Sequence, residues 1–205
     1  MKKIKYILFV IMAVVIFSPF KSYAQQNEVF VGYNFAIPLP DTKDYSSNVS
    51  YYGAEVNFKR FLKPNVSVSL SFAWNVFYTE TRDIIALPKA DVSGLQNRYV
   101  NTFPMLVGIQ YYAGNKDIRP YIGANVGALY SSRRLQIGIY DILEYKWRFM
   151  VQPEAGLIFK ANRSSDIALG VSYNYGFPAT SDITGKDVSE SWIGIKLSYG
   201  WKSGF

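Results

Sequence analysis

The sequence predicts an all-β fold, namely an antiparallel up-and-down transmembrane β-barrel of about eight strands. Three observations lead to this prediction. Apolar residues alternate with small or polar residues along each predicted strand, the connections are alternately long and short, and aromatic residues concentrate near the strand ends. Alternation with a period of two indicates a strand with two different faces. Membrane-spanning barrels combine it with aromatic girdles and with loops of unequal length.

The first 24 residues have the pattern of a signal peptide. Three lysines precede an apolar run of about a dozen residues, and small residues precede a plausible cleavage site after Ala24. A retained N-terminal anchor is the alternative, but the run is shorter than the ~20 residues that span a bilayer. We therefore expect residues 1–24 to be a signal peptide and residues 25–205 to form one barrel domain, with no periplasmic domain after the last strand.

Eight segments of the mature chain show the alternation. The predicted strands cover about residues 29–37, 51–61, 66–79, 99–112, 119–130, 145–160, 167–175 and 192–202. The third is the clearest, because seven apolar residues from Val66 to Tyr78 recur at every second position, which no helix places on one face. Pro104 and Pro153 lie inside predicted strands. We expect each to mark a β-bulge, since proline cannot donate to the ladder.

The lengths of the connections predict the topology. Four long connections are expected at residues 38–50, 80–98, 131–144 and 176–191, and three short ones at residues 62–65, 113–117 and 161–165. Outer-membrane barrels have long external loops and short periplasmic turns, so this order predicts both termini on the periplasmic side. The fifth and sixth strands can also continue beyond the membrane as a hairpin through residues 133–147.

Alternation alone also fits a soluble barrel with an apolar interior. The positions of glycine and aromatic residues indicate which face of each strand points outward. Nine of the 15 glycines lie within predicted strands on the polar face, where small residues suit the narrow interior of an eight-stranded barrel. Aromatic residues lie near both strand ends with aliphatic residues between them, which favours two girdles over an aromatic-rich core. The predicted girdle residues are Tyr33, Tyr52, Trp74, Tyr78, Phe103, Tyr111, Phe159, Tyr173, Tyr199 and Trp201.

Residues 102–112 and 119–130 resemble segments of the small, eight-stranded β-barrel family of Gram-negative outer membranes, the OmpA-, OmpX- and OmpW-like barrels without a periplasmic domain. The C-terminal Phe205, preceded at two-residue steps by Ser203, Trp201 and Tyr199, resembles the signal that the assembly machinery reads on barrel substrates. The resemblance covers essentially all of the mature chain. It implies a location in the bacterial outer membrane, contact with outer-membrane lipid and lipopolysaccharide, and insertion by the barrel assembly machinery.

The sequence contains no His and no Cys. Their absence removes the commonest general base and the commonest metal ligand, together with disulfides and thiolate metal sites. The known outer-membrane barrel enzymes resemble one another in relying on an active-site His. We therefore expect no catalytic residue, no cofactor and no metal. Lysines of the leader supply more than half of the formal charge of +7, so the basic balance does not indicate a nucleic-acid partner.

Charged and amide residues on the predicted inner face are candidates for a functional lumen. They could line a solute path, or they could fill the lumen as a plug of ion pairs and hydrogen bonds. Buried charges need partners, and about eight strands leave room only for side chains, so we predict the plug. The candidate residues are Glu55, Lys59, Gln110, Asn125, Glu154 and Lys196.

Three functions remain open at this point. We predict a monomeric barrel with a structural or surface-interaction role, in which the four long external loops contact a surface partner of unknown identity. A narrow transporter or channel for small or hydrophobic solutes is the alternative, and an enzyme is least favoured. The loops carry charges of both signs, typical of a solvated surface, but the adjacent pair Arg133 and Arg134 could contact lipopolysaccharide phosphates.

Overall fold

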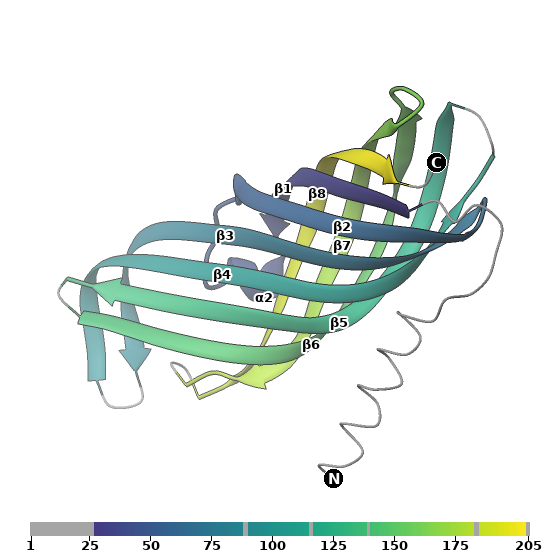
Figure 1. The fold of residues 1–205 in the computed structure, drawn as a ribbon. Helices are drawn as coiled ribbons and strands as arrows, with labels where there is room; N and C mark the ends of the chain where they lie inside the picture. Colours follow the sequence, from purple (N-terminus) through teal and green to yellow (C-terminus); the bar gives the residue numbers. More distant parts are fainter. Residues whose placement is uncertain (1–26, 88–89, 115–116, 139, 183–184, 204–205) are drawn as a thin grey trace, which may run out of the picture.

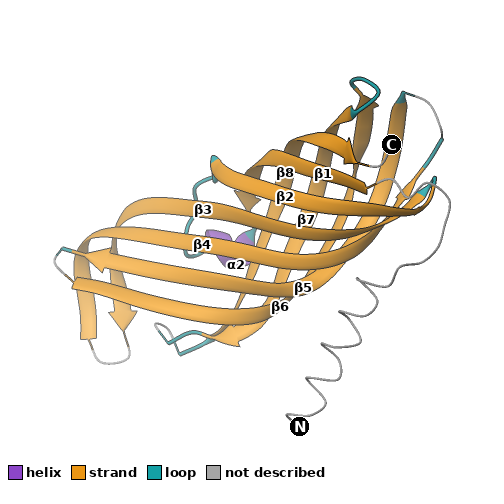
Figure 2. Cartoon of the chain, viewed as in Figure 1, coloured by secondary structure: helices purple, strands orange, loops and turns teal. Residues whose placement is uncertain are grey.

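A computed structural model describes residues 27–87, 90–114, 117–138, 140–182 and 185–203, with only the backbone described over residues 82–95. The signal-peptide segment and Phe205 lie outside the described residues. Nearly all of the described chain is strand, with one short helix (Figures 1 and 2). The elements are β1 (Asn27–Pro38), α2 (Pro40–Lys43), β2 (Tyr52–Lys63), β3 (Val66–Leu87), β4 (Ala90–Tyr112), β5 (Ile118–Ile137), β6 (Tyr140–Lys160), β7 (Ser165–Thr180) and β8 (Asp187–Ser203).

The eight strands form a closed barrel in sequence order. Each strand pairs antiparallel with the next, and β1 pairs with β8 over its whole length, from Asn27 opposite Ser203 to Pro38 opposite Trp192. Closure leaves no free sheet edge around the ring, which is what a sheet needs in a medium that cannot hydrogen-bond to backbone groups. The predicted fold class is confirmed. No helix among the described residues has the length and apolar character needed to cross a membrane.

Four neighbouring strands are much longer than the others and project from one end of the barrel (Figure 1). The β3–β4 ladder continues to Leu87 opposite Ala90, and the β5–β6 ladder to Ile137 opposite Tyr140. Most of the long connection expected over residues 80–98 is therefore strand, and the extended β5–β6 hairpin is present. Backbone pairing between adjacent strands can continue into water with polar residues, so mixed charge in this segment does not end the strands.

Both internal prolines remain in register, which corrects the expectation of β-bulges. Pro104 and Pro153 each pair without a shift with β5 on one side. On the other side, the described ladders lack the pairs at and beside each proline and then resume in the same register. A missing N–H thus removes local pairing without inserting a residue. The described register shifts lie instead near Phe61 in β2 and after Gly176 in β7.

The two faces of the barrel differ in the predicted sense. Large apolar side chains such as Ile109, Val126 and Leu197 are 44–55% exposed on the outside, whereas most of the buried side chains are polar or charged. Nine of the ten predicted girdle residues are exposed outward, and Phe159 is half-buried. An apolar exterior around a closed barrel is suited to lipid and would be unfavourable in water.

Aromatic rings form continuous contacts across the outside of the barrel near the projecting end. Trp74 lies 6.3 Å from Phe103, Phe103 lies 6.0 Å from Tyr130, and Tyr130 lies 5.0 Å from Trp147 between ring centroids. These residues belong to β3, β4, β5 and β6 in turn. Such a band is typical of the membrane–water boundary, so the strand segments beyond it are placed outside the hydrocarbon layer.

The apolar exterior leads to a prediction about Val126, which faces outward in the middle of β5. We expect Val126→Lys to lower the free energy of unfolding in a bilayer by about 2–4 kcal/mol, because it places a charge near the midplane. The measurement is urea unfolding of protein refolded into lipid vesicles. Leu143→Lys, on the outward face of the projecting hairpin, is the matched control, with an expected loss below about 1 kcal/mol. Equal losses at the two positions would contradict the assigned membrane level.

Candidate functional site

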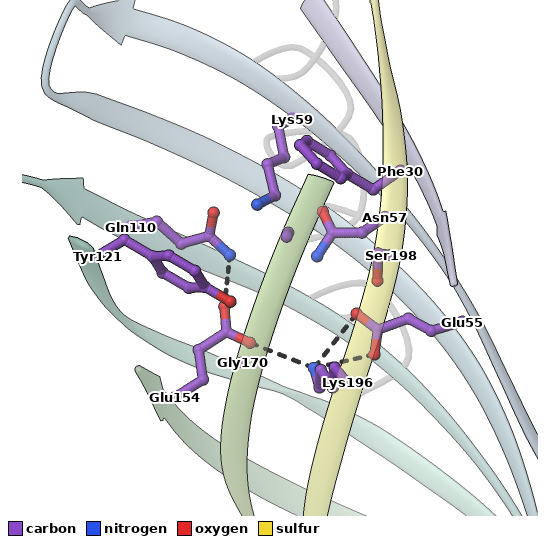
Figure 3. A pocket seen from close by; sticks show the side chains of 11 residues that line it. Phe30, Glu55, Asn57, Lys59, Gln110, Tyr121, Glu154, Gly170, Lys196 and Ser198 are labelled. Carbon is purple, nitrogen blue, oxygen red and sulfur yellow. Dashed lines mark hydrogen bonds and ion pairs between the residues drawn. The ribbon is translucent and has the colours of Figure 1, made fainter. Parts of the chain in front are cut away.

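The centre of the lumen contains an ion-paired cluster around Lys196 of β8 (Figure 3). Its Nζ lies 2.9 Å from Oε2 of Glu55 on β2 and 3.2 Å from Oε2 of Glu154 on β6. All three side chains are buried. Because charges removed from water must be paired, the ammonium and the two carboxylates depend on one another for their stability inside the barrel.

Amide side chains extend this cluster across the lumen. Gln110 donates a hydrogen bond to Oε1 of Glu154. Asn125 donates to Oε1 of Gln152 at 3.0 Å, and Nε2 of Gln152 donates to Oδ1 of Asn174 at 2.6 Å. The network thereby links β4, β5, β6 and β7 through their interior faces. Bonds of this kind satisfy polar groups that have no water to bind.

Lys59 of β2 is placed differently, although it is also buried. Its Nζ lies 4.4 Å from the ring centroid of Phe30, 5.1 Å from that of Tyr121 and 5.8 Å from that of Tyr112. Among the described residues, no carboxylate lies within ion-pair distance of this ammonium. Three aromatic rings around a desolvated cation stabilise it through cation–π attraction. Lys59 also supplies the positive charge that balances the excess carboxylate of the central cluster.

The space left between these side chains is small. The cavity next to Lys59, Gln110 and Glu154 has a volume of about 20 Å³, which is room for about one water molecule. An apolar layer lies in the lumen toward the short turns, formed by Phe30, Phe61, Tyr112, Tyr121, Ile158 and Ala168. A second apolar layer lies toward the projecting end, formed by Ala36, Phe77, Val100, Leu106, Leu129, Met150 and Trp192.

The β1–β2 connection folds into the outer mouth of the barrel and covers the second apolar layer. Thr42 of α2 is buried and donates a hydrogen bond to Oε2 of Glu190 at 3.0 Å. The other oxygen of Glu190 accepts a 2.8 Å bond from Nε of Arg133. Tyr45 packs against the apolar layer, and its ring centroid lies 5.0 Å from Cζ of Arg133. Burial raises the pKa of Tyr45 to about 12, so it contacts the guanidinium as a neutral phenol.

The adjacent arginines do not form a common surface site, because successive residues of a strand point to opposite faces. Arg133 points inward to Glu190 and is 3% exposed, whereas Arg134 points outward and pairs with Asp141. Hydrogen bonds from Arg134 hold the pKa of Asp141 below its ordinary value. The two guanidiniums therefore cannot hold one lipopolysaccharide phosphate together.

The structure brings together most of the predicted lumen residues. Glu55, Gln110, Asn125, Glu154 and Lys196 belong to one connected network of ion pairs and hydrogen bonds, while Lys59 contacts the aromatic layer instead. An outer ionic group in the lumen was not predicted, because Arg133, Glu144 and Glu190 were expected in long connections. Its fourth member, Arg148, was expected in the sixth strand. The alternation along β5 could have revealed this group, because Ser131 and Arg133 lie on the same face of the strand as Asn125. This outer group consists of Arg133, Glu144, Arg148 and Glu190, all buried.

No family model matches this sequence, and no curated protein sequence matches it. Solved structures do show the same fold. Ail, the attachment invasion locus protein of Yersinia pestis, superposes with a TM-score of 0.57 at 12% identity, covering 88% of this chain and 100% of Ail. Ail in complex with the heparin analogue sucrose octasulfate gives 0.55 at 15% identity over the same shares of the two chains. The outer membrane protein OprG from Pseudomonas aeruginosa gives 0.51 at 12% identity, covering 88% of this chain and 96% of OprG.

The chain is thus a transmembrane β-barrel of the small, eight-stranded outer-membrane type, as the sequence predicts. Identities this low show the fold alone, and one fold hosts many functions. Among the residues that the structure describes, no group of three or more His, Cys, Asp or Glu side chains could hold a metal ion.

The central cluster leads to a prediction about Lys196. We expect Lys196→Met to lower the free energy of unfolding by about 3–5 kcal/mol, because two buried carboxylates lose their ammonium. The triple variant Lys196→Met, Glu55→Gln and Glu154→Gln should recover most of that loss, since it removes the charges together. Urea unfolding in lipid vesicles measures both. A stable single variant, or a triple variant as unstable as the single one, would show that the ion pairs are not what holds the lumen side chains.

Proposed function

We propose that this protein acts in the bacterial outer membrane as a closed, monomeric barrel that presents a rigid interaction surface outside the cell. The observation that carries the proposal is the projecting sheet of β3–β6, whose two outer edges have no partner strand among the described residues. Outer-membrane lipid and lipopolysaccharide surround the barrel, and the outer-membrane assembly machinery inserts it. The sequence contains no His and no Cys, and we propose no enzymatic activity.

The projecting sheet offers a strand edge that is open to a partner. Pairing between β6 and β7 starts at Met150 opposite Gly176, so residues 140–149 of β6 are paired on the β5 side alone. Outward side chains of this segment are large and exposed, with Leu143 at 50% and Trp147 at 62%. An unpaired edge with an apolar stripe is the arrangement to which an extended segment of another protein adds as a further strand.

The edge is held in place by contacts on its inner side. Glu144 of β6 accepts hydrogen bonds from Ser181 and from the backbone N–H of Asp182 in the β7–β8 connection, and Lys146 pairs with Asp182 at 2.8 Å. These contacts leave the outward face of β6 uncovered. The sheet therefore presents its exposed edge and face in one fixed geometry, which lowers the conformational entropy lost on binding.

The filled lumen weighs against transport as the main role. A solute would have to displace two apolar layers, the central ion pairs and the folded β1–β2 connection. Each of these is made of side chains that contact one another directly. The cavity of about 20 Å³ beside Lys59, Gln110 and Glu154 is smaller than a nutrient or drug-sized solute would need.

Site-specific crosslinking in intact cells tests the surface role. A photoreactive residue at Tyr140, at the tip of the β5–β6 hairpin, is expected to form protein adducts, whereas one at the lipid-facing Leu169 of β7 should not. Leu143→Lys should reduce capture from position 140 at least tenfold, because a charge on the apolar stripe discourages strand addition. Capture that is absent at position 140, or that is equal at both positions, would contradict the proposed surface.

Conductance distinguishes the plugged barrel from the narrow channel. We expect the refolded protein to give no stepwise conductance in a planar lipid bilayer, and the same result for Lys196→Met, because two apolar layers still close the lumen. A porin measured in the same membrane is the positive control. Defined conductance steps from the wild type, or from Lys196→Met with unchanged unfolding stability, would favour the channel.

A further inference from the structure

The short-turn end of the barrel carries an excess of exposed positive charge, a feature that the proposed surface role does not use. Asp117 is the exposed acidic side chain among the described residues at this end. The positive side chains come from the end of β2, the end of β6 and the β6–β7 turn, so they lie on different sides of the barrel. We call this group the basic rim, and it consists of Arg60, Lys63, Lys160 and Arg163, all exposed or half-exposed.

Three members of the basic rim carry charge that is not neutralised within the described part of the chain. Lys63, Lys160 and Arg163 make no ion pair with any described residue. The neighbouring cations at this end behave differently, since Arg119 and Lys202 both pair with the buried Asp166, at 3.3 Å and 2.7 Å. These two cations share one carboxylate inside the lumen mouth, whereas Lys63, Lys160 and Arg163 carry their charge on its outer circumference.

The basic rim lies directly beside the apolar exterior. Arg60 points outward on the same face of β2 as Phe58, which is 45% exposed, and it sits opposite Val68 of β3, which is 37% exposed. Leu62, next to Lys63, is 50% exposed, and Ile118 at the start of β5 is 53% exposed. Positive side chains at the margin of an apolar band extend their charged ends toward lipid headgroups while their stems cover the apolar surface.

The opposite end of the barrel has no such surplus on its described surface. Arg134 is matched by Asp141 through two hydrogen-bonded nitrogens, and Lys43 in α2 follows Asp41 and precedes Asp44. Charges of both signs thus alternate around the projecting end. The two ends of the barrel therefore differ in surface charge as well as in strand length.

We propose that the basic rim binds anionic phospholipid headgroups in the leaflet that the short turns reach. Guanidinium groups contact phosphate oxygens in a bidentate manner, and lysine ammonium groups act as point charges. Basic residues next to a bilayer attract anionic lipid about fivefold for each Lys or Arg. A lipid is favoured over a soluble polyanion because the rim is continuous with exposed apolar side chains, which a soluble polymer could not cover.

Native mass spectrometry of the folded barrel released from mixed-lipid nanodiscs tests this proposal. The nanodiscs contain phosphatidylcholine with phosphatidylglycerol, or phosphatidylcholine with lipopolysaccharide. We expect the wild type to retain phosphatidylglycerol preferentially, and the preference to fall with added salt. The triple variant Lys63→Gln, Lys160→Gln and Arg163→Gln should reduce this preference for phosphatidylglycerol at least tenfold. The matched variant Lys43→Gln, Arg134→Gln and Lys186→Gln removes the same number of charges from the other end. It should keep the preference for phosphatidylglycerol.

Heat-modifiable migration in detergent gels first shows that each variant is folded. If the rim triple variant does not fold, the double variant Lys63→Gln and Arg163→Gln replaces it, because both side chains lie in or beside exposed turns. The proposal is overturned by equal retention of the two phospholipids, by an equal loss in both triple variants, or by retention of lipopolysaccharide in place of phosphatidylglycerol at the short-turn end.

Discussion

Backbone hydrogen bonding in a medium without water is the constraint on which the structure depends. Every N–H and C=O in the hydrocarbon layer must find a partner strand, and the pairing of β1 with β8 from Asn27 to Pro38 completes the ring. Closing a ring of eight strands fixes a narrow interior. The number of strands therefore sets a narrow lumen in which inward-facing side chains contact one another.

A filled interior then sets the chemistry of the lumen. Charges placed there lose water, so Lys196 must lie between Glu55 and Glu154, and Lys59 must lie against aromatic rings. The side chains sort into levels along the barrel axis, with apolar layers on both sides of the central ion pairs and a second ionic group at the outer mouth. The central cluster has two carboxylates and one ammonium, and Lys59 in the neighbouring aromatic layer offsets the excess, so the levels depend on one another.

The fold and the central lumen residues could be predicted from the sequence because both follow from a period of two. The alternation from Val66 to Tyr78 shows which residues of that strand face outward. The same alternation on other strands places Glu55, Glu154 and Lys196 on the inner face. Other features depend on information that a local pattern does not contain. The parity of Arg133 was available, but its charge suggested a loop, and its partner Glu190 lies 57 residues away.

The prolines illustrate a second limit of the sequence. Proline has no backbone N–H, so Pro104 and Pro153 cannot donate to the ladder. A strand can accommodate the proline with a β-bulge or by losing a few backbone pairs, and the pairing with its other neighbouring strand decides between the two. Here the register with β5 is kept on one side of each proline, and that continuity determines the outcome. Aromatic residues inside the lumen, such as Phe30 and Tyr121, were also outside the reach of a pattern that assigns rings to the membrane surface.

The unequal length of the strands has a mechanical consequence. Four adjacent strands that share hydrogen bonds as far as Ile137 and Leu87 bend together, so the projecting part is a stiff plate with its base fixed in the barrel wall. A force applied at the tip of such a plate acts on the barrel as a lever and tilts it within the bilayer. Separate flexible loops would absorb the same force locally. The length of β3–β6 therefore makes the projecting part and the barrel wall one mechanical unit.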